Sequence, residues 1–145
     1  MNVTSNIPHQ HIENKSFTVV INKEWQVSLA RRKLNMLAVA LGYNVNSTAE
    51  LVTAMSELAY NLFFHANSDG EVTVSVINSV NKTGISIMTR DSGPGIPSIE
   101  KALADGFSTN GGLGGGLPGT KRLMDEFTIS STLNGTLITC VKWLS

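Results

Sequence analysis

The sequence has little cysteine and no long apolar run. A single cysteine, Cys140, excludes a disulfide within the chain and argues against a thiolate metal cluster. No stretch approaches the ~18 consecutive apolar residues of a membrane span. Residues 1–16 are polar and lack the apolar core of a signal peptide. These absences favour a cytoplasmic protein without a membrane partner.

Charge is also scarce. Eleven Lys and Arg balance eleven Asp and Glu, so the formal net charge is zero, which argues against a surface built to attract nucleic acid. Charged residues make up 15% of the chain, below the roughly 25% typical of soluble domains. We therefore expect a partner protein to cover part of the surface.

Glycine is the residue that is unevenly placed. The 145 residues fit one domain, and nine of the thirteen glycines lie between Gly93 and Gly119. A segment of this kind needs backbone without side chains. The predicted domain covers residues 17–145, behind a polar and disordered tail, residues 1–16, in which His9 and His11 are incidental.

Two long helices are predicted in the first half of the chain. The first runs from about Gln26 to Leu41, because apolar residues recur at helical spacing and Gly42 follows as a stop. The second begins near Ser47 or Thr48, and Glu50 would complete a capping box. Its apolar stripe is Leu51, Met55, Leu58 and Leu62.

Strands are predicted on both sides of the glycine-rich segment. Residues 17–22 form a β-branched run that predicts a strand. Apolar and polar residues alternate from Val72 and again from Ile85, which predicts a hairpin with a polar turn at 78–84 and a second strand that ends at Asp91. Residues 128–133 and 136–143 flank Asn134-Gly135, a strong hairpin signal. Between the hairpins we expect a short helix over 98–105, irregular chain over 106–116, and a helix over 117–126 opened by Pro118. This order favours an α+β fold, with helices on one face of a mixed, largely antiparallel sheet.

The first candidate constellation is Glu57 with Asn61. Their i, i+4 spacing places both side chains on one side of the second helix. Leu58 and Leu62 are their neighbours, so the pair belongs at the rim of the buried face. Taken alone, such a pair is more often solvated surface.

The second constellation is Asp91-Ser92-Gly93-Pro94-Gly95-Ile96. An ionised carboxylate only accepts hydrogen bonds, so Asp91 suits an amino group such as that of adenine. Gly93 and Gly95 would let a flat ring approach the backbone. Taken alone, the pattern is usually a simple turn.

The third constellation is the glycine run Gly111–Gly119, which leads directly into a helix. Unshielded amides followed by a helix N-terminus bind anions. The run matches neither the P-loop nor the dinucleotide fingerprint, and a flexible linker is the alternative. Together the three constellations suit a nucleotide: a base-reading carboxylate, a phosphate cradle, and an amide oxygen for Mg²⁺, which often takes few protein ligands.

These residues resemble a known family. Glu57-x-x-x-Asn61, Asp91-x-Gly93-x-Gly95 and Gly112-x-Gly114-x-Gly116 look like the N box and the two glycine boxes of the GHKL ATPase superfamily, whose members bind ATP in a two-layer Bergerat sandwich. The stretch Asp105–Phe127, closed by Gly135-Thr136 and Lys142-Trp143-Leu144, is very similar to the RsbT-type switch kinases of bacterial stress signalling. The likeness spans about residues 17–144.

The resemblance implies roles for individual residues. Asn61 would ligate Mg²⁺, Asp91 would bind the adenine amino group, and Thr136 would lie beside Asp91. Glu57 is the implied general base, and residues 106–115 would form a mobile lid over the triphosphate. The implied ATP-binding set is Asn61, Asp91, Gly93, Gly95, Ile96, Gly112, Leu113, Gly114, Gly115, Gly116, Leu117 and Thr136.

Some features depart from the family pattern. Many relatives carry a lysine in the lid, whereas this lid has none, so neutralisation of the γ-phosphate would fall to Mg²⁺ and to Lys121 or Arg122. His65 is expected to end its helix rather than to accept phosphate, because a cation is favourable there.

Three function classes remain open from the sequence. The leading one is a protein-serine/threonine kinase that phosphorylates a STAS-domain antagonist or stressosome scaffold and, once released, activates a PP2C-type phosphatase. The second is an ATP-binding module that sequesters a partner without phosphoryl transfer, as anti-sigma factors do. The third, the catalytic domain of a histidine kinase, ranks last because the chain has no room for the dimerisation helices.

Overall fold

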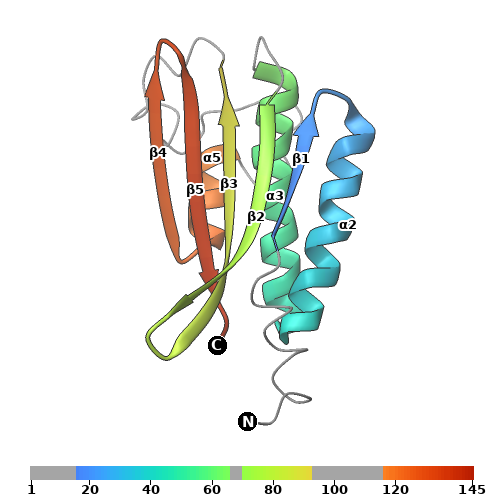
Figure 1. Ribbon diagram of the computed structural model, residues 1–145, viewed down its shortest axis with the longest axis vertical. Coiled ribbons are helices and arrows are strands. Elements are labelled where there is room, and N and C mark those ends of the chain that lie inside the picture. Colours follow the sequence, from blue (N-terminus) through green and yellow to red (C-terminus); the bar gives the residue numbers. More distant parts are fainter. Residues whose placement is uncertain (1–15, 66–69, 93–115) are drawn as a thin grey trace.

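The computed structural model describes residues 16–65, 70–92 and 116–145, and in these ranges five strands form one sheet that three helices cover on a single face (Figure 1). The predicted α+β sandwich is thereby confirmed. The elements are β1 (Ser16–Ile21), α2 (Glu24–Leu41), α3 (Val45–His65), β2 (Gly70–Ser79), β3 (Lys82–Asp91), α5 (Gly116–Leu123), β4 (Glu126–Thr132) and β5 (Gly135–Trp143).

The strand order is β1-β2-β3-β5-β4, and every pairing among the described strands is antiparallel. The sheet is therefore fully antiparallel over these ranges rather than mixed. Alternate residues face the helices, as the period-2 pattern predicts. The buried core residues Val72 and Val74 of β2 and Ile85 and Ile87 of β3 come from this inner face.

The helices form the second layer. The long helix α3 packs against α2 on one side and α5 on the other, and it also contacts β1, β2 and β3. Gly42 ends α2 as expected: its φ of 100° is left-handed, and its N–H binds the Ala38 carbonyl at 3.2 Å.

The predicted start of α3 is wrong by two or three residues. The helix begins at Val45, and the side-chain oxygen of Asn44 accepts the Ser47 N–H at 2.7 Å. Asn44 therefore caps the helix, and Ser47 already lies in its first turn. At the other end His65 is the last residue of α3, as expected.

The first hairpin turn is tighter than predicted, and the second is shifted by one residue. The β2–β3 loop contains only Val80 and Asn81, because Asn81 adopts a left-handed φ of 66°. In the second hairpin Thr132 pairs with Gly135, so the loop is one residue earlier than expected, at 133–134.

The predicted helix over 117–126 is too long at its C-terminal end. Leu123 is the last residue of α5, since the Asp125 N–H already binds the Val141 carbonyl at 2.9 Å and starts the pairing of β4. Glu126 is thus the first residue of a strand.

Cys140 lies in the core and is fully buried. Desolvation raises the pKa of its thiol to about 12, so at neutral pH it carries no thiolate. The residue therefore acts as a small apolar side chain. None of the helices in the described ranges combines the length and apolarity that crossing a membrane requires.

Candidate functional site

The ends of β3 and α3 and the start of β5 lie at the same end of the molecule, the upper end in Figure 1. Asp91 is the last residue of β3, and the sheet register places Thr136 of β5 directly opposite it. Cross-strand partners share a face of the sheet. The structure therefore confirms that these two residues are neighbours, while their contact with a ligand stays a prediction.

Thr136 is fixed by a further hydroxyl. It is 8% exposed, and its Oγ1 lies 2.9 Å from the Oγ of Ser131 on β4, in hydrogen-bond contact. The Ser131 side chain lies on the same face of the sheet as that of Thr136, because the two residues are register partners. Sequence reasoning missed Ser131, since its place beside Thr136 depends on a pairing that the misplaced turn obscured.

Gly135 allows β5 to start against the end of β3. A Cβ at this position would collide with the backbone oxygen of Asp91 and lie 3.1 Å from the Cα of Ser92. Its φ of 145° also disfavours any L side chain. Any residue other than glycine would push β5 away from Asp91.

The last turns of α3 lie over this end of the sheet. A Cβ on Gly70, the first residue of β2, would be 2.6 Å from a methyl carbon of Leu62 and 3.2 Å from the carbonyl oxygen of Arg90. Leu62 therefore packs against the sheet next to the residue before Asp91. Asn61, the preceding residue on α3, is partly exposed at the same end.

Glu57 is more deeply buried than predicted. It is 1% exposed, whereas the sequence placed it at the rim of the apolar face. The interpretation as solvated surface is wrong for this residue. Burial of a carboxylate opposes folding unless the group is compensated, and such groups are concentrated at functional sites.

The first turn of α5 is the third part of the site. The helix begins at Gly116 with a left-handed φ of 72°, and residues 116–120 are all buried. Thr120 donates its hydroxyl to the Gly116 carbonyl at 3.2 Å. Since α5 packs on α3, its N-terminal amides are held against the helix that carries Glu57 and Asn61.

Several predicted site residues lie outside the described residues. They are Gly93, Gly95, Ile96, Gly112, Leu113, Gly114 and Gly115, together with the expected lid and the expected helix over 98–105. Of the predicted phosphate cradle, the structure describes only Gly116 and Leu117.

The described groups fit a ligand that carries both an amino group and phosphates. Asp91 and Thr136 offer acceptor oxygens at one end of the sheet, whereas the start of α5 offers amide donors and the positive end of a helix dipole. Asn61 adds an amide oxygen of the kind that Mg²⁺ accepts.

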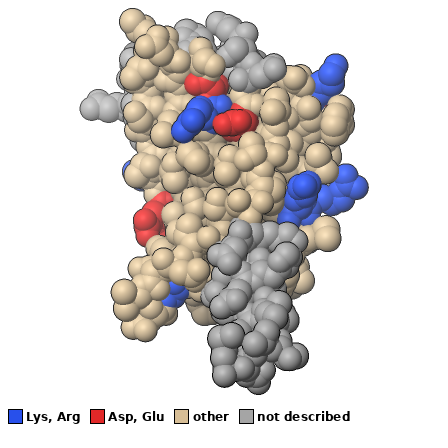
Figure 2. Space-filling model, viewed as in Figure 1, with Lys and Arg blue, Asp and Glu red and all other residues tan. Residues whose placement is uncertain are grey.

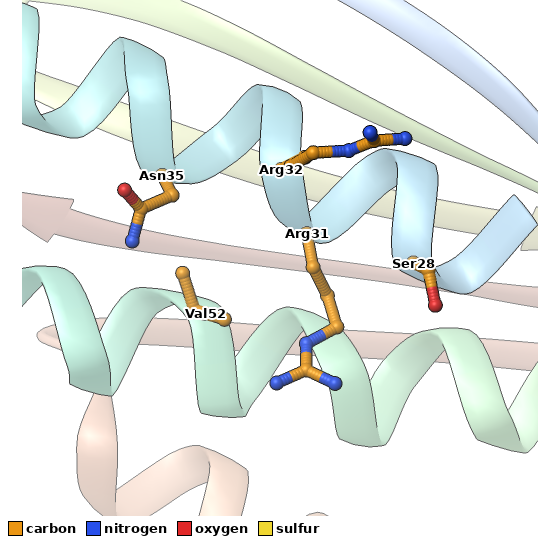
Figure 3. Close-up of a pocket in the computed structure, with 5 residues that line it drawn as sticks. All are labelled: Ser28, Arg31, Arg32, Asn35 and Val52. Carbon is orange, nitrogen blue, oxygen red and sulfur yellow. The ribbon is translucent and has the colours of Figure 1, made fainter.

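A groove between α2 and α3 is separate from these residues. It is lined by Ser28, Arg31, Arg32, Asn35 and Val52, with a volume of about 360 Å³. Figure 3 shows Arg31 extending from α2 toward α3, whereas the Arg32 side chain runs along α2. Sequence reasoning missed this groove, although the adjacent arginines Arg31 and Arg32 could have indicated a binding surface.

Comparison with known proteins identifies the class. A family model described as a histidine kinase-like ATPase domain matches residues 20–142. The chain therefore belongs to the histidine kinase-like ATPase family and, within it, to the RsbT-type protein-serine/threonine kinases that its motifs resemble.

The most similar relatives include two kinds of regulator. The serine/threonine-protein kinase RsbT of Bacillus subtilis is 44% identical over 132 residues, which cover 90% of this chain and 98% of RsbT. An anti-sigma F factor of a Thermoanaerobacter species is 32% identical over 130 residues, covering 86% of this chain and 90% of that protein.

A solved structure supports the fold. The RsbU and RsbW domains of a Mycobacterium tuberculosis protein match with a TM-score of 0.63 and 17% identity, covering 90% of this chain and 32% of that one. At this identity the likeness concerns the fold alone.

Proposed function

We propose that this chain is an ATP-dependent protein-serine/threonine kinase that works as a cytoplasmic partner switch. Its substrate is a STAS-domain antagonist or stressosome scaffold protein, and once released it activates a PP2C-type phosphatase. The observation that carries the proposal is the pairing of Asp91 with Thr136 at the end of the sheet over which α3 and its Glu57 and Asn61 lie.

Asp91 and Thr136 would select the base. The Asp91 carboxylate accepts a hydrogen bond from the adenine amino group, because an ionised carboxylate has acceptors only. The hydroxyl oxygens of Ser131 and Thr136 lie 2.9 Å apart, and this hydrogen bond holds the Thr136 hydroxyl in place. A fixed donor and acceptor pair favours adenine over guanine, whose oxygen at the equivalent position cannot donate.

The start of α5 and Asn61 would serve the phosphates. The amides of Gly116 and Leu117 lie at the buried start of α5, where N–H groups of a helix N-terminus would donate to phosphate oxygens. Bound Mg²⁺ would neutralise phosphate charge and orient the triphosphate, and Asn61 is the residue that would offer it an oxygen.

Glu57 would receive the proton of the acceptor hydroxyl as that oxygen attacks the γ-phosphorus and ADP leaves. Glu57→Gln keeps the shape of the side chain but removes its basicity, so ATP affinity should stay unchanged while phosphorylation slows roughly tenfold. The effect is modest because a loose transition state needs little early proton abstraction. Single-turnover transfer to the purified substrate measures it, and Glu57→Ala should agree if it folds. A normal rate in Glu57→Gln would mean that another group acts as the base.

The groove between α2 and α3 is a candidate contact for the protein substrate. Within the described ranges neither Arg31 nor Arg32 forms an ion pair, so both can meet acidic groups of a partner. Reversing both charges (R31E/R32E) should weaken substrate phosphorylation at least tenfold through KM and leave ATP binding intact. The matched control is Lys33→Glu, since Lys33 lies over the Phe17 ring on the other side of the helix. An unchanged KM in the double variant contradicts the assignment.

Labelled ATP and a purified STAS-domain protein test the function as a whole. We expect phosphoserine or phosphothreonine on the partner. The second candidate, a sequestering module without transfer, is favoured by the 32% identity to an anti-sigma F factor. A stable complex without labelled serine or threonine would establish that alternative.

A further inference from the structure

We propose that Lys142 is a positioning residue for the phosphate-binding end of α5. The proposal rests on the proposed function, because it assigns the amides at the start of α5 to the triphosphate. It gives a role to the Lys142-Trp143-Leu144 sequence, which the nucleotide-binding residues leave unexplained.

Lys142 lies near the end of β5 and joins three elements. The register pairs it with Ile85, a residue of the buried inner face, so its side chain starts on the side of the helices. Its Nζ donates to the Leu123 carbonyl at 2.9 Å and lies 3.2 Å from Oε1 of Glu50 on α3. One ammonium group therefore connects β5, the C-terminal end of α5 and α3.

The hydrogen bond from Lys142 to the Leu123 carbonyl is the stronger of its two contacts, because the Glu50 side chain is 42% exposed and its ion pair is screened by solvent. The Lys142 side chain is 12% exposed, and a hydrogen bond with a charged donor is about twice as strong as a neutral one. Leu123 is the last residue of α5, where carbonyls lack helical partners and the helix dipole is negative. The Lys142 ammonium donates to the Leu123 carbonyl and places a positive charge at the negative end of the helix dipole.

The backbone around Lys142 is held as well. Its carbonyl accepts the Tyr43 hydroxyl at 2.6 Å, and the Trp143 N–H donates to the Asp125 carboxylate at 2.7 Å. These bonds fix the β5 end from the α2–α3 connection and from the segment after α5. Lys142 thus projects from a rigid support.

The helix that it holds depends on such contacts. α5 has eight residues, and helices of this length are unstable on their own. Its two ends are about 12 Å apart at 1.5 Å per residue. A displacement of Leu123 away from α3 therefore also moves the Gly116 amides relative to Glu57 and Asn61.

The variant Lys142→Met keeps most of the apolar stem but removes the charge. We expect its affinity for a non-hydrolysable ATP analogue to fall about tenfold, whereas its affinity for AMP stays within about twofold, because AMP lacks the phosphates that α5 binds. Lys142→Arg should restore ATP affinity, since a guanidinium can serve both acceptors. Glu50→Gln should give a smaller loss, and the double variant should be no weaker than Lys142→Met alone.

Lys82→Met is the matched control. Lys82 lies at the same end of the sheet, and its ammonium is 4.1 Å from the centre of the Trp143 ring. Lys82→Met therefore removes the same charge at a lysine that is not bonded to α5. Equal losses of ATP and AMP affinity, or no loss in folded Lys142→Met, would overturn the positioning role. If Lys142→Met fails to fold, Glu50→Gln alone decides by the same ratio.

Amide hydrogen exchange separates this proposal from the proposed function. Without any nucleotide, the amides of α5 should exchange faster in Lys142→Met than in Lys82→Met. If the unmodified chain binds no ATP, the proposed function fails, yet faster exchange confined to α5 would still support the link through Lys142. Unchanged exchange in α5 would contradict it.

Discussion

Asp91→Asn is expected to weaken ATP binding roughly 100-fold. The amide can turn a donor toward the adenine amino group, so the contact becomes either two opposed donors or a weaker neutral bond. A buried donor left unsatisfied costs up to about 3 kcal/mol, and each 1.4 kcal/mol is about tenfold in affinity. Calorimetric titration with ATP in the presence of Mg²⁺ measures the change.

The matched control is Glu71→Gln, which also converts a carboxylate to an amide. Glu71 pairs with Arg90 in the row beside Asp91, so its side chain points to the opposite face of the sheet. Its ATP affinity should equal that of the unmodified chain. If Asp91→Asn binds ATP normally, Asp91 does not contact the base, and the site assigned to this end of the sheet is wrong.

Asn61→Ala is expected to remove the Mg²⁺ dependence of ATP binding and to slow phosphoryl transfer more than about 100-fold, because the metal contributes several kcal/mol of transition-state stabilisation. ATP affinity in this variant should be the same with Mg²⁺ and with EDTA. Paired titrations and a single-turnover assay give both quantities.

Asn46→Ala supplies the control on the same helix. Asn46 lies exposed in the first turn of α3, far along the helix from Asn61, so Mg²⁺ should still strengthen its ATP binding. An undiminished effect of Mg²⁺ in Asn61→Ala would remove Asn61 from the metal site.

The charges on the sheet face visible in Figure 2 are few. Outward-facing strand residues are largely uncharged, such as Thr18 and Thr73, whose hydroxyls lie 2.9 Å apart. Away from this face, Arg31 and Arg32 line the α2–α3 groove and Lys142 forms its ion pair with Glu50.

Local chemistry explains which predictions were accurate. The alternation of Val72 and Val74 with polar residues defines one buried face whatever the rest of the chain does, and Gly42 ends α2 because it can adopt a left-handed φ. Boundaries that depend on distant contacts were misplaced. Asp125 leaves the helical path because the carbonyl of Val141, sixteen positions later, accepts its N–H.

The sequence by itself determined the α+β class, the helix that carries Glu57 and Asn61, the strand that ends at Asp91, and the family. These follow from periodicity, turn residues and short motifs, which act between near neighbours in the chain. Only the tertiary structure decided that Glu57 is buried, that Thr136 is held by Ser131, and that Lys142 joins α3 to α5. Those facts depend on sheet register and helix packing, which bring together residues that no local pattern relates.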